Sequence, residues 1–383
     1  EILKNRMQLL NVNAAYEQRW IINSLKNYPT VLKTPNILYD VDKEVFINKP
    51  AIIVAAGPSL NEEFENLRKI KSEGSAYIFT VGSAINALID QDIMPHAALT
   101  YDPSHLNQVV FKKIKEKDIT EIPVIFGSSV GYETLEKLKN PKAHFITSQD
   151  TVSAYTMKLL DEDEIDVILD APSISVLALQ LLSQLGASPI ILVGQNLGFL
   201  NSHRYAKGIE YEHITSEIRE EEKKDIFEVD SNDGTKMYTN DSFKRMQRDL
   251  ELTIKNFPIN NVINTTKKGI VIEGTIFQPL EEVMKHFTSN TILNLTVKNE
   301  NRYDLSYIQK QWIKLSKEKD LSEEHIKSVK QIIEDLKKVS KNLQVNKINK
   351  YFPILDEEVN KTIQNLYYRT FIGPMVRVQY EFM

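Results

Sequence analysis

The chain has 383 residues, and its 47 Lys and Arg residues against 52 Asp and Glu residues give a formal net charge of −5. This mild acidity gives no support for nucleic-acid binding, which normally requires a basic domain. The chain contains no cysteine, which excludes disulfides, Cys-ligated zinc, iron–sulfur clusters and thiol nucleophiles. The length predicts two or three domains, and no segment is apolar enough to predict a membrane span.

Residues 1–48 are predicted to form an N-terminal helical extension or the remainder of a truncated domain. Apolar residues such as Leu10 and Trp20 recur at helical spacing, and Pro29 and Pro35 are expected to break the pattern.

Residues 49–288 alternate between short β-branched runs and amphipathic stretches, which predicts βαβ units in an α/β fold. We expect a Rossmann-like, doubly wound and largely parallel sheet. The clearest helix covers residues 173–185, where Ser173 is a good N-cap and Gly186 follows the last turn. A further helix is expected near 240–255, and strands are expected at 51–55, 76–81, 97–100, 123–126, 143–147, 166–169, 190–193, 261–264 and 270–273.

Two charged stretches follow the predicted core of the sheet. Residues 217–230 carry seven acidic residues against three basic ones, which indicates a solvated helix face or a mobile loop. Residues 310–350 carry eleven Lys against six acidic residues, with apolar residues at helical spacing from Ile326 to Val339. Residues 289–383 are therefore predicted to form an all-α C-terminal domain.

The sharpest local motif is Gly57-Pro58-Ser59, which follows the first expected strand and precedes a helix. Ser59 and Glu62 fit a capping box, in which each side chain binds an unpaired backbone N–H group. A helix that begins at the carboxyl edge of a parallel sheet is typical of anion binding. The pattern favours a nucleotide or phosphate site, and a simple capped turn is the alternative.

Polar residues also follow other expected strands or open the next helix, and these are Ser83, Asp102, Ser173, Gln195 and Asn196. Asp102 is a candidate to bind ribose hydroxyls, hold a metal, act as a base or cap its own turn. The loop beyond residue 198 contains His203, Tyr205 and His213. Because the carboxyl ends of parallel strands lie at one edge, we expect these loops to converge on a single crevice.

Several catalytic signatures are missing from the sequence. No His-Glu-x-x-His, Gly-x-Ser-x-Gly or Walker A motif occurs, and the seven histidines are scattered. We therefore predict no metal site, and the candidate chemistry depends on hydroxyls, carboxylates, His and helix ends.

The order of these motifs resembles the motility-associated factor (Maf) family of flagellin glycosyltransferases. The central domain of that family is similar to bacterial sialyltransferases that use CMP-activated sugars, and to MptE-like proteins. The matching stretches are residues 57–60, 82–83, 101–103, 172–173, 185–187, 191–197 and 233–240.

The resemblance implies a sialyltransferase-like glycosyltransferase whose donor is a CMP-nonulosonic acid of the pseudaminic or legionaminic type. It implies flagellin Ser or Thr hydroxyls as acceptors, action in the cytoplasm and a role in flagellum assembly and motility. No cofactor is required beyond the donor substrate. The helical C-terminal domain would help to engage flagellin.

The resemblance also suggests roles for individual residues. Tyr205 lies near the position of a tyrosine that hydrogen-bonds the leaving phosphate, and Asp102 or His203 is the candidate base. Two departures are that Asn196 stands where the family commonly has Asp, and that no His occurs near Thr235. The expected donor contacts are Gly57, Pro58, Ser59, Ser83, Asp102, Ser173, Gln195 and Asn196.

Two alternatives stay open at this point. The Gly-Pro-Ser turn and Asp102 are also similar to MptE-like 6-hydroxymethylpterin pyrophosphokinases, which would use ATP and Mg²⁺. A non-catalytic flagellin-binding assembly protein that keeps a nucleotide-binding fold is the other alternative.

Overall fold

The computed structural model describes residues 2–161, 164–209, 211, 215–257, 259, 261–292, 295, 297, 300–341 and 345–377. The chain divides into two compact units, and each is formed by segments that are distant in sequence. The larger unit comprises Asn27–Ser148 and Asp166–Arg302, and the smaller comprises Glu1–Lys26, Gln149–Ile165 and Tyr303–Met383. The boundaries predicted near residues 48 and 288 both fall inside the larger unit.

The larger unit contains a nine-stranded parallel sheet with the strand order β11-β10-β7-β1-β2-β3-β4-β5-β6. The predicted α/β class with a parallel sheet is confirmed. The chain proceeds outward from β1 to β6 and then returns to the other side of β1, so β1 and β7 form the topological switch point. The strands are β1 (Ala51–Val54), β2 (Tyr77–Val81), β3 (Ala97–Thr100), β4 (Val124–Gly127), β5 (Lys142–Thr147), β6 (Val167–Ile168), β7 (Ile190–Val193), β10 (Val262–Asn264) and β11 (Ile276–Phe277).

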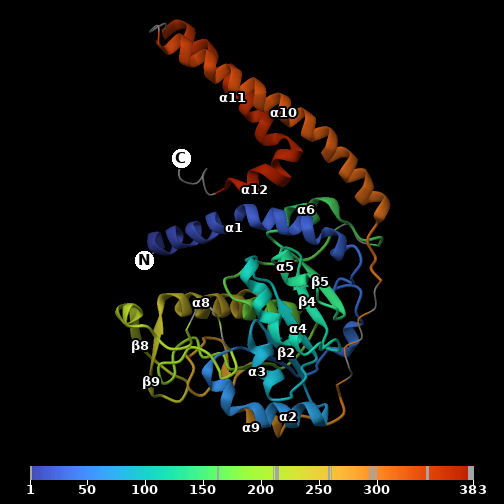
Figure 1. Ribbon diagram of the computed structural model, residues 1–383, viewed down its shortest axis with the longest axis vertical. Helices are drawn as coiled ribbons and strands as arrows, with labels where there is room; N and C mark the ends of the chain where they lie inside the picture. The colour runs from blue at the N-terminus through green and yellow to red at the C-terminus, as the bar shows by residue number, and fades with distance from the viewer. Residues whose placement is uncertain are drawn as a thin grey trace. The chain divides into compact units, whose positions relative to one another are not determined.

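Helices cover both faces of this sheet, as its uninterrupted apolar strands require. On one face, α7 (Ile174–Gln184) and α8 (Asp241–Asn256) pack on alternate strand residues such as Ala51 and Ile53. On the other face, Ile52 and Val54 contact the second layer of helices. That layer contains α2 (Phe64–Glu73), α3 (Ala84–Asp90), α4 (Lys112–Glu116) and α9 (Leu280–Met284) (Figure 1).

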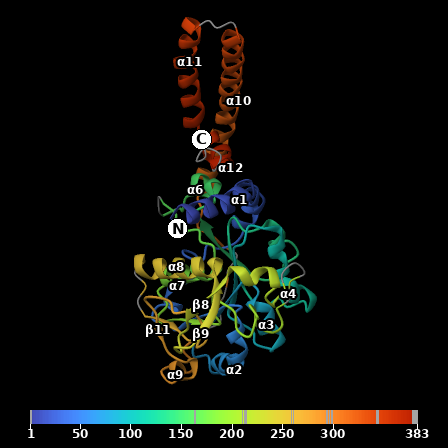
Figure 2. The ribbon, with the colours of Figure 1, turned by 90° about the vertical axis from the view of Figure 1, so that its left-hand side faces the viewer.

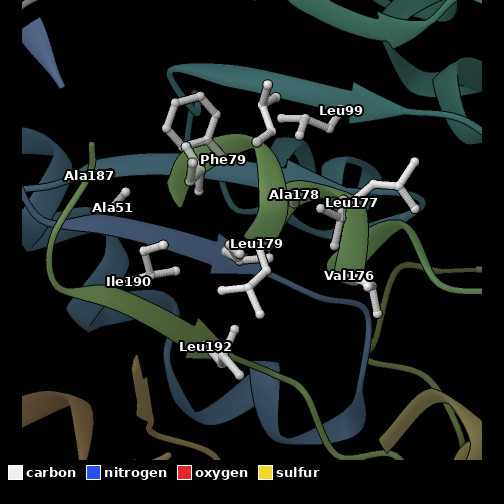
Figure 3. Close-up of a cluster of buried hydrophobic side chains, with 14 of the residues drawn as sticks. Ala51, Phe79, Leu99, Val176, Leu177, Ala178, Leu179, Ala187, Ile190 and Leu192 are labelled. Atoms are coloured by element: carbon white, nitrogen blue, oxygen red, sulfur yellow. The ribbon is translucent and has the colours of Figure 1, made fainter. Parts of the chain in front are cut away.

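The core under α7 explains why this helix was the clearest in the sequence. Its residues Val176 to Leu179 are all buried and lie among strand residues from β1, β2, β3 and β7 (Figure 3). Ser173 is its N-cap and accepts a hydrogen bond from the Ser175 backbone N–H at 3.3 Å. Gly186 has a φ of +80°, a left-handed conformation that glycine adopts without strain. The predicted start and end of this helix are confirmed.

The acidic stretch at 217–230 folds differently from either predicted form. It contains a short 3-10 turn, η4 (Glu220–Asp225), followed by β8 (Ile226–Asp230), which pairs antiparallel with β9 (Lys236–Asn240). The turn between the strands is held by the Asp233 carboxylate, whose Oδ1 accepts hydrogen bonds from the hydroxyls of Ser231 and Thr235 at 2.6 Å each. A hairpin therefore stands where we expected a helix or a loop.

Two further local expectations are wrong. The helix α1 (Ile2–Val31) includes Pro29 and ends two residues after it, so the proline lies in the last turn and does not end the helix earlier. No strand forms at 270–273, since Ile270 donates its backbone N–H to the Asn196 carbonyl at 3.0 Å and forms a bridge with Ser231 instead of joining the sheet.

The smaller unit is helical, as predicted for the C-terminal region. The long helices α10 (Leu305–Lys341) and α11 (Val345–Gln364) lie side by side in opposite directions, with His325 near Glu358 and Asn365 bonded to Glu318 (Figure 2). The unit also contains α6 (Thr151–Thr156), a π-helical turn, η5 (Tyr368–Ile372), and α12 (Gly373–Met375). Within the described ranges, no helix has the length and hydrophobicity needed to cross a membrane.

Candidate functional site

Six of the residues selected from the sequence lie at the carboxyl edge of β7, β1, β2 and β3, which are four adjacent strands. They form two groups. The first, which we call the β1/β7 half, contains Gly57, Ser59, Gln195 and Asn196. The second, the β2/β3 half, contains Ser83 and Asp102.

Gly57 is required by the close approach of two loops in the β1/β7 half. Its backbone N–H donates to the Gly194 carbonyl at 2.9 Å. A Cβ atom at position 57 would collide with that same carbonyl oxygen and with the Asn196 side chain. The absence of a side chain therefore allows the loops after β1 and β7 to pack against each other.

Asn196 holds this half together and is only 1% exposed. Its Oδ1 accepts a hydrogen bond from the Ser59 backbone N–H at 3.0 Å. Its Nδ2 donates to Ser59 Oγ at 2.7 Å and to the Lys268 carbonyl at 2.8 Å. An aspartate could not donate to a carbonyl, so this network requires the amide at the position where the resembled family commonly has Asp.

The predicted capping box of Ser59 and Glu62 does not form. Residues Pro58–Glu62 form a 3-10 turn, η2, whose N-cap is Gly57, and α2 begins only at Phe64. The Ser59 hydroxyl and amide are both bonded to Asn196, and Pro58 has no N–H group. The Ser59 amide is therefore occupied by Asn196, whereas the Ser59 hydroxyl only accepts from Asn196 Nδ2, and the expected anion site at this turn stays a prediction.

In the β1/β7 half, one polar side-chain atom of Gln195 has no hydrogen-bond partner among the described residues. Its backbone N–H donates to Thr266 Oγ1 at 3.0 Å, and the residue is 5% exposed. Its Oε1 accepts no hydrogen bond from the described residues. Buried acceptors are rarely left without a donor, so this oxygen is a candidate ligand contact.

Ser83 is the N-cap residue of α3, but its hydroxyl does not cap the helix. The hydroxyl instead makes a hydrogen bond with the Tyr211 side chain. Gly82, with a φ of +54°, turns the chain between β2 and α3 and lies against Ile174 at the start of α7. The N-terminus of α7, including Ser173, therefore lies beside the β2/β3 half.

Asp102 lies at the end of β3 and is exposed. Its Oδ1 accepts a hydrogen bond from the Ser104 backbone N–H at 2.7 Å, so the residue does cap its own turn. The Asp102 charge also acts on the Tyr211 hydroxyl, whose pKa it raises. The Asp102 carboxylate thus caps its own turn and also acts electrostatically on the Tyr211 hydroxyl.

Tyr211 is the main functional candidate that the sequence reasoning missed. Burial is the largest cause that raises the pKa of Tyr211, to about 12, with smaller raising effects from Tyr205 and Asp102. Burial also raises the pKa of Tyr205, and the two ring centroids are 5.3 Å apart. Both hydroxyls therefore stay protonated at neutral pH and are suited to donate hydrogen bonds.

His203 makes its polar side-chain contacts with residues outside this cluster. Its side chain is 48% exposed, its Nδ1 is 2.8 Å from the Asn201 carbonyl and its Nε2 is 3.7 Å from Glu217. Among the described residues, no hydrogen bond or ion pair joins the His203 side chain to either half of the site. His213 lies outside the described residues.

Further contacts come from the chain after β10. Thr266 and Lys268 supply the oxygens bound by Gln195 N and Asn196 Nδ2, and the Asn232 Nδ2 atom donates to the Thr266 carbonyl at 2.8 Å. The run Asn264-Thr265-Thr266 directly follows an expected strand, so the strand-end reasoning used elsewhere would have selected it. No periodicity or motif marks Tyr211.

Three comparisons with known proteins bear on this site. No curated protein sequence matches the chain. The model of the family described as 6-hydroxymethylpterin diphosphokinase MptE-like matches residues 22–202, so this part of the chain is similar to MptE-like proteins.

Among solved structures, the fold is similar to that of a Maf glycosyltransferase from Magnetospirillum magneticum AMB-1, with a TM-score of 0.62 and 15% sequence identity. The match covers 96% of this chain and 54% of the other, so the chain spans about half the length of that protein. The predicted resemblance to both groups is confirmed, and at this identity the structural match establishes the shared fold.

Proposed function

We propose, from the MptE-like domain and the fold shared with a Maf glycosyltransferase, that this protein is a glycosyltransferase. It transfers a nonulosonic acid of the pseudaminic or legionaminic type from a CMP-activated donor to Ser or Thr hydroxyls of flagellin, in the cytoplasm before export. One observation carries the proposal most directly. The Ser83 hydroxyl, the Asp102 carboxylate and the Tyr211 hydroxyl gather at the carboxyl edge of the sheet, beside the N-terminus of α7.

The leaving group in this reaction is CMP. The bond between the anomeric carbon and the phosphate oxygen breaks, and the phosphate keeps the electron pair. The α7 N-terminus supports negative charge at this edge, and Tyr211 donates a hydrogen bond to the phosphate oxygen. The high pKa of Tyr211 keeps its proton available at neutral pH.

The acceptor hydroxyl attacks the anomeric carbon from the opposite side and forms the new C–O bond. Its proton needs a base, and we assign this role to Asp102, whose carboxylate is exposed next to Ser83 and Tyr211. His203 is less suited because its polar side-chain contacts are Asn201 and Glu217 and not Ser83 or Tyr211. Gln195 Oε1 is the remaining candidate donor contact.

The test is transfer in solution. The protein is incubated with a CMP-nonulosonic acid of proven integrity and with flagellin, and the intact mass of flagellin is measured. We expect a mass increase equal to whole sugar residues, lost in Asp102→Asn and kept in Lys139→Met, which changes an exposed ion pair with Asp118. An unchanged flagellin mass in the wild type contradicts the proposal. Flagellin binding without any affinity for CMP would instead support a non-catalytic assembly role.

A second candidate is a pterin pyrophosphokinase, which the family match over residues 22–202 favours. It predicts Mg²⁺-dependent release of AMP from ATP in the presence of 6-hydroxymethylpterin. Measuring AMP release in parallel with sugar transfer separates the two functions, because each uses a different nucleotide and acceptor.

A further inference from the structure

The segment that carries Tyr205 and Tyr211 is fixed to the rest of the larger unit at three consecutive residues. The Ala206 backbone N–H donates to the Ala56 carbonyl at 2.9 Å. The Lys207 backbone N–H donates to Asn61 Oδ1 at 2.9 Å. The Gly208 carbonyl accepts a hydrogen bond from Lys113 Nζ, also at 2.9 Å.

The third attachment is built from charged side chains. Lys113, from α4, forms an ion pair with Asp90, the last residue of α3. Both side chains are partly buried, at 23% and 34% exposed, which makes the pair less screened by water than an open surface pair. The ammonium group is therefore oriented toward Gly208 by a fixed partner.

The backbone conformation of Gly208 and its lack of a side chain allow it to lie against the Lys113–Asp90 pair. Its φ is +84°, which side chains other than that of glycine rarely tolerate. A Cβ atom there would lie 2.6 Å from Asp90 Oδ2. The segment can approach the ion pair this closely only because position 208 has no side chain.

The length of α3 matches the distance that the chain from Gly208 to Tyr211 can cover. Asp90 is at the C-terminal end of α3 and Ser83 is at its N-terminal end, so about 10 Å of helix separates the two contacts. Tyr211 is three positions after Gly208, and a chain can cover at most about 10 Å in three steps. Fixing Gly208 at one end of α3 thus lets the Tyr211 side chain reach Ser83 at the other.

We propose that Lys113 and Asp90 are positioning residues, which hold Gly208 so that the Tyr211 hydroxyl lies between Ser83 and Asp102. The pair touches neither Ser83 nor Asp102 in the described contacts, and it acts through its contact with the backbone of Gly208, three positions before Tyr211. The role in transfer rests on the proposed function, whereas the placement of Tyr211 can be measured without any substrate.

The substrate-free experiment compares the wild type with Lys113→Met, Lys113→Arg and Lys139→Met. Backbone hydrogen exchange at Ala206 and Lys207 should accelerate about tenfold or more in Lys113→Met, because the neighbouring attachment is lost. The ¹³Cζ resonance of Tyr211, identified by its loss in Tyr211→Phe, should show partial ionisation at pH 10.5 in Lys113→Met and almost none in the wild type. Arg keeps a charged donor and should restore most of both signals, and Lys139→Met should match the wild type.

The activity experiment is a double-mutant cycle. Lys113→Met should lower kcat/KM for the CMP donor about tenfold, the effect of losing one charge-assisted hydrogen bond. In a Tyr211→Phe background the same substitution should lower kcat/KM less than about twofold, since the two changes act on one group. A purely structural role for Lys113 predicts equal losses in both backgrounds.

The outcomes separate the two proposals. Unchanged exchange and unchanged Tyr211 ionisation in Lys113→Met overturn the positioning role, whatever the activity. Altered exchange and ionisation in a protein that has no transfer activity support the positioning role and overturn the proposed function. Equal, additive losses in the cycle overturn the link between Lys113 and Tyr211.

Discussion

The two halves of the candidate site look alike in sequence but differ in how their polar groups are used. In the β1/β7 half, the amide and hydroxyl of Ser59 and the side chain of Asn196 all bind one another or nearby backbone. In the β2/β3 half, Ser83, Asp102 and Tyr211 gather around a point where hydroxyl and carboxylate groups remain able to contact a ligand. The first half therefore stabilises the switch point of the sheet, and the second is the better candidate for chemistry.

The largest expected effect is on stability, from Gly57→Ala. The new methyl group collides with the Gly194 carbonyl and Asn196, so we expect a loss of about 3 kcal/mol or more in the free energy of unfolding. Gly234→Asn is the matched control, because Asn tolerates left-handed backbone and nothing lies within 4 Å of the added Cβ. Denaturant titration measures both, and equal stability of the two variants would contradict a structural β1/β7 half.

Asn196→Asp tests the same half with almost no change of volume. It places a buried carboxylate opposite the Lys268 carbonyl and removes both hydrogen bonds that Nδ2 donates, so we expect a loss of about 2 to 3 kcal/mol at pH 7. Protonating the new side chain restores one donor, so the deficit should shrink as the pH falls. An unchanged stability at pH 7 would mean that the amide network does not hold the loops.

Lowering the pH should destabilise the sheet through two buried histidines that belong to neither half of the site. Burial lowers the pKa of His96 and of His144 to about 3 each, with a smaller lowering effect from Lys71 on His96. Below pH 6.5 the unfolded chain binds protons that the folded chain does not, so stability present above pH 6.5 is lost as the pH falls. Between pH 6.5 and pH 5, each histidine should lower the free energy of unfolding by about 2 kcal/mol.

The control for this pH dependence is His96→Asn, whose Oδ1 can accept the Ile78 backbone N–H that His96 Nδ1 now accepts at 2.9 Å. The slope of stability against pH should become shallower in this variant. If the slope is the same as in the wild type, His96 is not one of the groups responsible.

Tyr211→Phe should separate the two halves most clearly, because it affects activity more than folding. One hydrogen bond to Ser83 is lost, so the free energy of unfolding should fall by less than about 1 kcal/mol. The donor phosphate also loses a hydrogen-bond donor, so kcat/KM should fall about tenfold or more. Normal activity in this variant would remove Tyr211 from the site.

The smallest expected effect belongs to His203→Gln. The side chain is exposed and contacts only Asn201 and Glu217 among the described residues, so stability should stay within about 0.5 kcal/mol of the wild type. Sugar transfer should change by less than about twofold. A hundredfold fall in kcat would instead restore His203 as the base and overturn the assignment of Asp102.

The comparison also explains what could be predicted from the sequence. Two-sided burial makes central strands such as β1 and β7 uninterrupted apolar runs, and Ser173 and Gly186 mark the ends of α7, so these elements were predictable. Parallel strands bring their carboxyl ends to one edge, so the gathering of the strand-end residues was predictable as well.

The hydrogen-bond partners of the residues at the carboxyl edge of the sheet could not be predicted. Ser59 and Asn196 are 137 residues apart, and nothing local to Ser59 shows that its hydroxyl binds an amide instead of capping a helix. Tyr211 reaches Ser83 only because distant residues fix the backbone before it. The hairpin of β8 and β9 was missed because its charged residues obscure the alternation of a half-exposed strand pair.

The division of the chain into interleaved segments has a consequence for its synthesis. Every segment of the larger unit precedes residue 303, whereas the smaller unit also needs Tyr303–Met383, which are translated later. Residues Glu1–Lys26 are translated before the larger unit, yet they must wait for Tyr303–Met383 before their own unit can be completed. The sheet of the larger unit can therefore fold while the smaller unit is still incomplete. During that interval, the helix at residues 2–26 is the part most exposed to chaperones and proteases.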